Sequence, residues 1–214
     1  MAARKRRKMR APSPSVRKEV TVLVDVSFCK KLAKRNLSEK RYTHTLNVAQ
    51  LAKRLAKQYG ADPTKAEVAA LLHDICKEKP KQELLQMLQD HAIMTGNAAQ
   101  KPVGIWHAAA GMVYIKEELG VEDEEILGAV RWHTSGHAGM TLLEKIIYMA
   151  DMCSAERSYR EVEELRSLLD KDLDKAFIKA VAYSIAWLKE EKRPLDPDSE
   201  ACLAFERERF LAAR

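Results

Sequence analysis

The sequence contains no unbroken apolar run of about 18 residues, so no segment of it is suited to cross a bilayer as a helix. A secretory signal peptide is also missing, because no apolar stretch follows the basic start of the chain. We therefore expect a cytoplasmic protein without a membrane partner. At 46% hydrophobic and 32% charged residues, the composition is that of a globular protein.

Cysteine pairs of the C-x-x-C type are absent, which argues against a zinc ribbon and against a disulfide framework. The four cysteines are scattered along the chain, and we expect reduced, mostly buried thiols at Cys29, Cys76, Cys153 and Cys202.

Acidic residues are missing from the first 18 positions, which hold eight basic residues and end in a Pro/Ser-rich stretch. The rest of the chain carries 29 basic and 31 acidic residues, so its formal charge is −2. We predict a disordered basic tail over residues 1–18. Such a tail makes weak contact with nucleic-acid phosphates or is simply solvated.

Strand patterns are almost absent too. The one candidate, Glu19–Phe28, would have no partner strand, and it is either a strand or an irregular lead-in. Helical periodicity fills the remainder: Ser38 is suited to cap a helix that ends at Gly60, and Asp62 with Pro63 is suited to start another that runs through residue 76. Further helices are predicted over residues 80–90, 105–119, 122–132, 140–155, 159–169, 172–191 and 198–214.

The fold class is therefore all-α, a bundle of about eight or nine helices by the usual length of helices. We expect one domain over residues 19–196, followed by a C-terminal helical extension over residues 197–214.

His73 and Asp74 stand side by side directly after five apolar residues. An ionised Asp in such a setting is costly unless a partner compensates its charge. Four other histidine and aspartate residues stand in similar settings. Each alone fits an ordinary core position, but together with His73 and Asp74 they predict a metal site of imidazole and carboxylate ligands. The other residues in comparably apolar settings are His44, His107, His133 and Asp151.

Adjacent residues of a helix point about 100° apart, so His73 and Asp74 can both reach a metal beside the helix. A carboxylate can bridge two cations, which an imidazole cannot, and this makes Asp74 the natural shared ligand of a two-metal centre. Two metals about 3.5–4 Å apart can clamp phosphoryl oxygens.

The ordered motifs R-Y-x-H, L-L-H-D-x-x-K, W-H, H-T-x-G and A-D, with Arg157 after the last, resemble the YqeK-type family of HD-domain metal-dependent phosphohydrolases. These small bacterial proteins hydrolyse diadenosine tetraphosphate symmetrically to two ADP. The resemblance covers residues from about 28 to 190 and implies an HD-domain helical bundle that acts through a metal-activated hydroxide.

The resemblance also implies a ligand set. One metal would be held by His44, His73, Asp74 and Asp151, and the other by Asp74, His107 and His133. Iron, as a di-iron centre, is the metal that the resemblance implies, although these ligand types also suit Mn, Co, Ni, Zn or Mg. The chain departs from the family pattern in two places: Ala108 replaces a typical Gly, and Ser154-Ala155 stand where Glu-Pro is typical.

Several residues are candidates for substrate contact or catalysis. Lys77 lies three residues after Asp74 and is suited to meet a phosphate oxygen, and Arg157 is suited to bidentate phosphate contacts. The hydroxyl and amides of Thr134 to Gly136 can cradle a phosphate in a turn. His137 is either a proton donor to the leaving nucleotide or a surface histidine. Arg41 is a further candidate to enter the site.

Two other functions stay open at this point. The chain can be another HD-type nucleotide phosphohydrolase, such as a nucleotidase or dNTPase, because the metal ligands would be the same. It can also be a non-enzymatic scaffold with a structural metal and a nucleic-acid-binding tail, although structural sites leave no open coordination position. A homodimer is also left open by the sequence.

Overall fold

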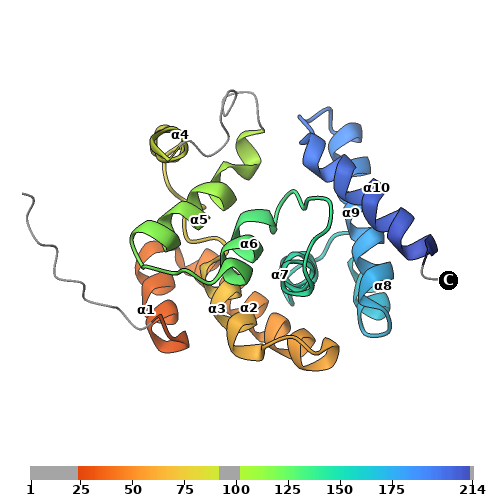
Figure 1. Cartoon of the computed structure of the whole chain (residues 1–214), viewed down its shortest axis with the longest axis horizontal. Coiled ribbons are helices and arrows are strands. Elements are labelled where there is room, and N and C mark those ends of the chain that lie inside the picture. The colour runs from red at the N-terminus through yellow and green to blue at the C-terminus, as the bar shows by residue number, and fades with distance from the viewer. Residues whose placement is uncertain (1–23, 92–101, 213–214) are drawn as a thin grey trace, which may run out of the picture.

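Ten α-helices and one short 3₁₀-helix make up the parts of the chain that the computed structural model describes, residues 24–91 and 102–212, and no strand occurs in these ranges (Figure 1). The predicted all-α class is confirmed. The helices are α1 (Val26–Asn36), α2 (Glu39–Tyr59), α3 (Pro63–Leu72), α4 (Lys81–Asp90), η2 (Val103–Ile105), α5 (Trp106–Glu117), α6 (Glu124–Trp132), α7 (Leu142–Cys153), α8 (Val162–Leu169), α9 (Leu173–Glu190) and α10 (Pro197–Ala212).

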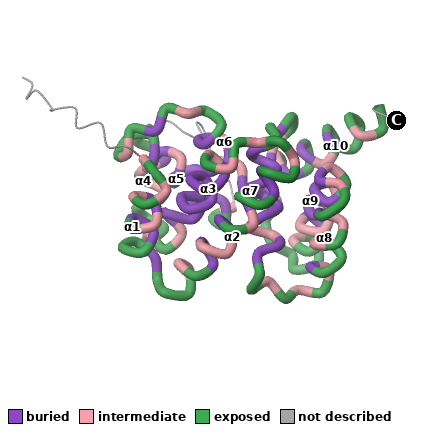
Figure 2. The backbone as a smooth tube through the Cα atoms, turned by 90° about the horizontal axis from the view of Figure 1, so that it is seen from below, coloured by how far each residue is buried: buried purple, intermediate pink, exposed green. Residues whose placement is uncertain are grey.

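Helix α7 lies between two groups of helices, with α1 to α6 on one side and α8 to α10 on the other (Figure 1). It packs against α2, α3 and α6 in the first group and against α8 and α9 in the second. Burial is concentrated on α3 and α7 in the middle of the molecule, while the outer helices expose one face (Figure 2). Residues carried by α3 and α7 therefore start out inside the core.

The predicted starts of α2 and α3 are confirmed by their caps. The Ser38 side chain accepts a hydrogen bond from the amide of Arg41, and Gly60 ends α2 in the left-handed conformation. Asp62 accepts from the amides at positions 64 and 65, and Pro63 occupies the first turn of α3. These local signals fix where α3 enters the core.

One strand prediction and one helix boundary were wrong. The segment Glu19–Phe28 is not a strand where the structure describes it, because Asp25 caps the amide of Phe28 and α1 begins at Val26; residues 19–23 lie outside the described ranges. This extra helix accounts for ten helices in place of eight or nine. Helix α3 ends at Leu72, so that His73 to Lys79 form tight turns rather than continuing a helix through residue 76.

Helix α10 packs against α9 and reaches α7 through an ion pair between two buried side chains, Lys145 and Glu206, at 2.7 Å. The four cysteines are free and buried, as predicted. None of the helices in the described ranges combines the length and the apolar character needed to span a bilayer. The predicted basic tail, residues 1–18, lies outside these ranges.

Candidate metal centre

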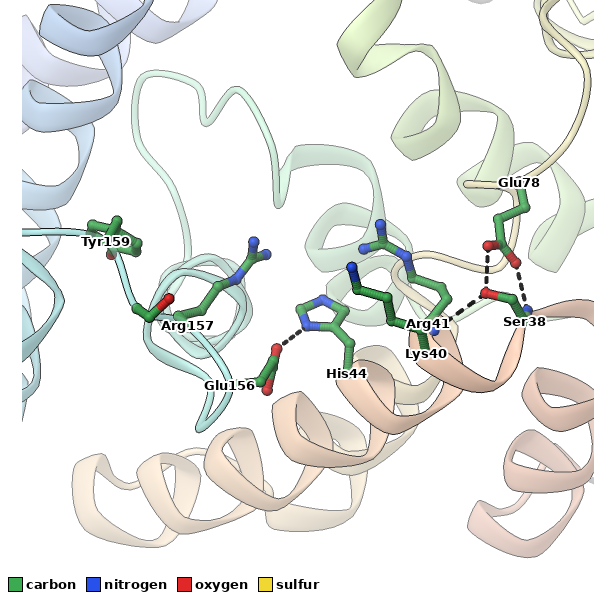
Figure 3. Close-up of a pocket in the computed structure, with 9 residues that line it drawn as sticks. Ser38, Lys40, Arg41, His44, Glu78, Glu156, Arg157 and Tyr159 are labelled. Atoms are coloured by element: carbon green, nitrogen blue, oxygen red, sulfur yellow. Dashed lines mark hydrogen bonds and ion pairs between the residues drawn. The ribbon is translucent and has the colours of Figure 1, made fainter.

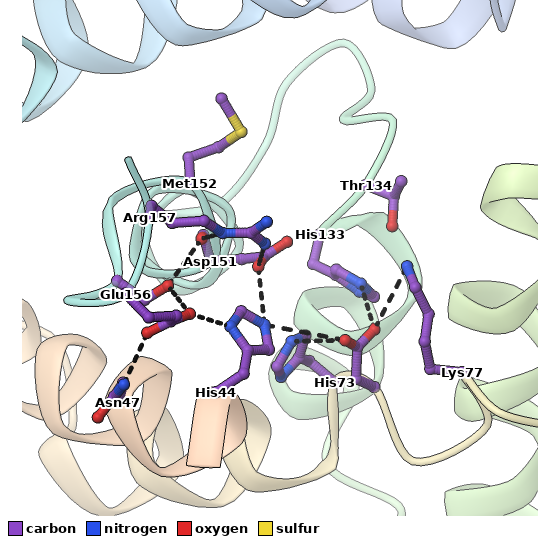
Figure 4. A network of polar contacts seen from close by, with 12 residues as sticks. His44, Asn47, His73, Lys77, His133, Thr134, Asp151, Met152, Glu156 and Arg157 are labelled. Atoms are coloured by element: carbon purple, nitrogen blue, oxygen red, sulfur yellow. Dashed lines mark hydrogen bonds and ion pairs between the residues drawn. The ribbon is translucent and has the colours of Figure 1, made fainter. Parts of the chain in front are cut away.

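Six side chains from five separate segments of the chain meet beside the end of α3, and Figure 4 labels four of them, His44, His73, His133 and Asp151. Asp74 lies in the turn after α3 and is 2% exposed. The imidazoles come from the N-terminal half of α2, the end of α3, the first turn of α5 and the end of α6. A second carboxylate comes from the last turn of α7. These residues are His44, His73, His107, His133 and Asp151. The structure thus brings together every ligand predicted from the sequence.

The two oxygens of Asp74 face different pairs of histidines. Its Oδ2 lies 3.8 Å from Nε2 of His44 and 3.5 Å from Nε2 of His73. Its Oδ1 lies 3.2 Å from Nε2 of His107 and 3.6 Å from Nε2 of His133. Asp151 joins the first pair, because its Oδ1 lies 3.1 Å from Nε2 of His44. Asp74 therefore stands between two sets of donors, as a bridging carboxylate would.

Two of the histidines direct Nε2 into the cluster while Nδ1 is engaged elsewhere. Nδ1 of His73 lies 2.6 Å from the carbonyl oxygen of Ala70, and Nδ1 of His133 lies 2.8 Å from that of Val130. A carbonyl only accepts, so Nδ1 must donate in both rings. In the neutral ring Nε2 then carries the lone pair that a metal ligand needs.

Buried polar atoms without a hydrogen bond mark the same place. Nε2 of His44, Nε2 of His73 and Oδ1 of Asp74 are all buried and make no hydrogen bond of acceptable geometry among the described residues, although charged groups lie within 4 Å of them. Leaving such groups unpaired is costly. A divalent metal would satisfy them, and nitrogen and oxygen donors without cysteine fit such an ion.

Both carboxylates of the cluster and two of its histidines, His107 and His133, have lowered pKa values. Burial alone would raise the pKa of Asp74, but its histidine neighbours hold that pKa well below the usual range. Burial likewise opposes ionisation of Asp151, but the close contact with His44 and the charge of Arg157 lower its pKa. Burial lowers the pKa of His107 to about 4. The cluster thus offers ionised carboxylates and, at His107, a neutral imidazole near pH 7.

Basic side chains surround the carboxylates. Arg41 donates from Nη1 to Oδ2 of Asp74 at 2.8 Å, and Arg157 donates to both the carboxylate and the backbone carbonyl of Asp151. On the other side, Nζ of Lys77 lies 3.7 Å from Oδ1 of Asp74 and 3.1 Å from Nε2 of His107. The tight turn after α3 still stacks positions three apart, so Lys77 reaches Asp74 although the helix has ended.

A cleft of about 490 Å³ opens beside the His44 side of the cluster (Figure 3). Figure 3 shows Lys40, Arg41 and Arg157 within it, all close to His44. The cleft is therefore lined by cations next to the carboxylates of Asp74 and Asp151, which suits an anionic ligand. Its lining residues are Ser38, Lys40, Arg41, His44, Glu78, Glu156, Arg157, Ser158 and Tyr159.

The remaining candidates lie at the other edge of the cluster. The Thr134 hydroxyl is 3.4 Å from Nε2 of His107. The amide of Gly136 donates to the carbonyl of Trp132 at 2.9 Å, so it closes the turn rather than pointing at the cluster. His137 lies 3.2 Å from a carboxylate oxygen of Glu144 and packs against Trp132. The predicted roles of these three residues stay predictions.

Sequence reasoning missed one group at the centre. Glu156 receives a hydrogen bond from Nδ1 of His44 and another, at 2.6 Å, from the Asn47 side chain (Figure 4). Burial would raise the pKa of Glu156, but the hydrogen bonds, that from His44 first, lower it to about 2. The sequence alone shows only that Asn47 follows His44 by three residues and therefore shares a helix face with it.

Comparison with known proteins gives a consistent picture. A family model described as HD domain matches residues 41–156. The chain is 41% identical over 166 residues to a protein of Bacillus subtilis (strain 168) named bis(5'-nucleosyl)-tetraphosphatase, symmetrical, and this covers 78% of the chain and 89% of that protein. A protein of the same name from Halalkalibacterium halodurans is 38% identical over 175 residues, which covers 79% of the chain and 90% of that protein.

A solved structure is similar along nearly its whole length. It is the crystal structure of a predicted HD superfamily hydrolase involved in NAD metabolism from Clostridium acetobutylicum, with a TM-score of 0.82 and 32% identity. The match covers 86% of this chain and 97% of that one. The overall helical arrangement is therefore shared with that protein.

Proposed function

Since the chain belongs to the HD-domain family, we propose that it is a metal-dependent phosphohydrolase that cleaves diadenosine tetraphosphate symmetrically to two ADP. The observation that carries the proposal is the position of Asp74, whose two oxygens face two separate pairs of histidines. This arrangement supports a two-metal centre, and relatives that match over most of their length are named for this reaction.

The donor set supports the division of ligands that the family resemblance implies. His44, His73, Asp74 and Asp151 would hold one metal, and Asp74, His107 and His133 would hold the other. A bound metal pair supplies a water molecule activated near neutral pH and neutralises charge on phosphoryl oxygens. Iron is the proposed native metal, and metal analysis of the purified protein tests it against Mn, Co, Ni, Zn and Mg.

The chain's own cations fit a polyphosphate that passes across the cluster. Arg41, Arg157 and the exposed Lys40 lie on the cleft side, and Lys77 lies on the opposite side, next to His107. A tetraphosphate bound across the centre would therefore meet positive charge at both ends. The same side chains hold the negative charge that develops on the equatorial oxygens of the attacked phosphate.

Proton delivery to the leaving group places little demand on the protein. Attack at the second phosphate releases ADP, which is a fair leaving group without a strong general acid. Within the described residues, the contacts of His137 are to Glu144 and Trp132, so its proposed role as proton donor depends on the bound substrate. The hydroxyl of Thr134 lies nearer to the cluster, 3.4 Å from Nε2 of His107.

The test is product identification with the metal-loaded protein. We expect ADP as the sole product from diadenosine tetraphosphate; ATP with AMP would contradict symmetrical cleavage. Faster turnover of dNTPs or nucleoside monophosphates in the same panel would favour the other HD phosphohydrolases. The Asp74→Ala variant should lose bound metal and reduce turnover ~10³-fold. Normal turnover by a metal-stripped Asp74→Ala sample would rule the mechanism out.

The scaffold alternative predicts a different pattern. A protein whose metal is purely structural would hold metal but hydrolyse nothing in the nucleotide panel. We expect deletion of residues 1–18 to leave turnover unchanged, since the cluster lies wholly outside them. Loss of RNA or DNA binding in the same variant would assign a phosphate contact to the tail.

A further inference from the structure

Among the histidines of the cluster whose Nδ1 partner is visible, His44 alone has a carboxylate there. His73 and His133 donate from Nδ1 to backbone carbonyls three residues earlier in the chain. His44 lies within α2, where the carbonyls are used by the helix, and its Nδ1 bonds instead to the carboxylate of Glu156, 112 positions away. Its partner is therefore supplied by a different element.

Glu156 is itself held from both oxygens. Asn47 donates to Oε2 at 2.6 Å, and the buried Ser154 hydroxyl donates to Oε1 at 2.7 Å. Asn47 lies one helical turn after His44, while Ser154 ends α7 just beyond Asp151. The carboxylate thus joins α2, which carries His44, to the turn after α7, and α7 carries Asp151. Ser154 is also one of the positions at which the chain departs from the family pattern.

We propose that Glu156 is a positioning residue that fixes the tautomer and orientation of His44, so that the Nε2 lone pair faces the metal held by Asp151 and Asp74. The proposal deepens the proposed function, since it assumes that His44 is a metal ligand. A carboxylate on the second nitrogen of a ligating histidine fixes the proton there and makes the imidazole a stronger donor. Because of this carboxylate, the two halves of the metal centre differ in the Nδ1 partners of their histidines.

That difference predicts a selective effect. The half of the centre on Oδ1 of Asp74 includes His133, whose Nδ1 partner is a neutral carbonyl. The half on Oδ2 includes His44, whose partner is a carboxylate. Removing Glu156 should therefore weaken one of two metal-binding events and leave the other nearly unchanged.

Two variants separate the tautomer from the charge. In Glu156→Ala, His44 loses its Nδ1 acceptor, and we expect about 10- to 100-fold weaker binding of Mn²⁺ at one site, the range typical of outer partners of metal ligands. In Glu156→Gln, the amide oxygen can still accept from Nδ1, so a loss of less than about 10-fold is expected. Calorimetric titration of the chelator-treated full chain with Mn²⁺ measures both.

A matched control is Glu78→Gln. Glu78 lines the same cleft but bonds to the amide and hydroxyl of Ser38 rather than to a histidine. The Glu78→Gln variant removes the same charge from the same cleft. We expect its Mn²⁺ affinity to stay within about twofold of wild type, because no metal ligand loses its hydrogen-bond partner. A loss in Glu156→Ala no larger than that in Glu78→Gln would show that only the charge of the cleft matters, and it would overturn the proposal.

A spectroscopic measurement keeps the proposal falsifiable without metal or substrate. In ¹⁵N-histidine-labelled protein, the nitrogen shifts of His44 should report an Nδ1-protonated ring in the wild type and in Glu156→Gln. In Glu156→Ala they should report a mixture of tautomers, with the other cluster histidines unchanged, which also shows that the fold is intact. An unchanged His44 signal in Glu156→Ala, with unchanged Mn²⁺ affinity, would refute the role. Failure of the proposed function would instead appear as normal metal binding without turnover.

Discussion

The Nε2 atoms of His107 and His133 lie 3.1 Å apart, and both face Oδ1 of Asp74. Burial lowers the pKa of each imidazole, to about 4 for His107, so both rings are neutral near pH 7. His133 donates from Nδ1 to a carbonyl, and its Nε2 therefore presents a lone pair to this contact. A cation shared by these three groups would satisfy all of them.

This relationship predicts the effect of removing one ring. His107→Ala should lower the metal content from two ions per chain to about one, because only the Oδ1 half loses a ligand. The affinity of that half should fall at least ~100-fold, beyond the range typical of outer partners, and turnover should fall in proportion. Metal analysis after dialysis and a turnover assay measure the two effects. His91→Ala, at an exposed histidine that ends α4, is the control; a full metal content in His107→Ala would contradict the division of ligands.

Arg157 provides a test of phosphate recognition in the cleft. Its guanidinium now donates to the carboxylate and carbonyl of Asp151, which shows that a forked donor fits beside the cluster. Arg157→Lys keeps the positive charge but loses the planar fork, so we expect kcat/KM for diadenosine tetraphosphate to fall about 10-fold.

The control for this prediction lies three residues further on. Arg160 has a side chain that is 93% exposed and lies 3.9 Å from a carboxylate oxygen of Glu161, so Arg160→Lys should leave kcat/KM at the wild-type value. If Arg157→Lys behaves in the same way, charge alone is sufficient at position 157.

Glu67 provides a pH test away from the metal centre. Its side chain is 10% exposed and pairs with Lys30 on α1 and Lys53 on α2. Burial would raise its pKa, but hydrogen bonds from the two lysines lower it below 4.5. A carboxyl whose folded pKa is depressed stabilises the fold above its unfolded pKa, and this contribution disappears as the pH falls through the folded pKa.

Glu67→Gln should therefore lower the free energy of unfolding by about 1–2 kcal/mol at pH 7, since the lysines are only half-buried. The difference from wild type should shrink as the pH falls below about 4.5, the usual pKa of glutamate. Urea unfolding at pH 7 and pH 3.5 measures both values. Glu200→Gln, in an exposed pair with Lys189, should change stability by less than ~0.5 kcal/mol at either pH. A pH-independent loss in Glu67→Gln would show that packing rather than charge is responsible.

Much of the metal centre could be predicted from the sequence because each ligand stands in an apolar stretch. His73 and Asp74 follow the buried run over residues 66–72 of α3, and Asp151 follows the buried run of α7. A charged or polar group in such a stretch needs a partner, and this requirement is visible without a structure. The helix caps at Ser38 and Asp62 could also be predicted, because a cap depends on neighbours only a few residues away.

The parts that could not be predicted depend on distant contacts or on subtle backbone changes. Glu156 stands in a polar stretch, and its role exists only because the turn after α7 lies against α2. The end of α3 at Leu72 has no glycine or proline to mark it, and His73 keeps helical dihedral angles. The β-branched run before α1 favours a strand locally, but Asp25 caps a helix that packs on α3.

The turn that follows His133 gives the last prediction. Gly136 and Gly120 both have positive φ angles, 66° and 68°, so an alanine at either position is strained by about 1 kcal/mol. A Cβ at position 120 would meet no atom within 4 Å, whereas one at position 136 would lie 2.9 Å from Sγ of Cys202 on α10. Gly136→Ala should therefore lose about 1–3 kcal/mol more than Gly120→Ala in urea unfolding, because α10 or the turn must move. Since the same turn carries His133 and Thr134, the kcat of Gly136→Ala should also fall, while the kcat of Gly120→Ala should not. Adding Cys202→Ala to Gly136→Ala makes room for the new methyl group and should recover part of both losses; equal stability of the two single variants would show that α10 does not restrain this turn.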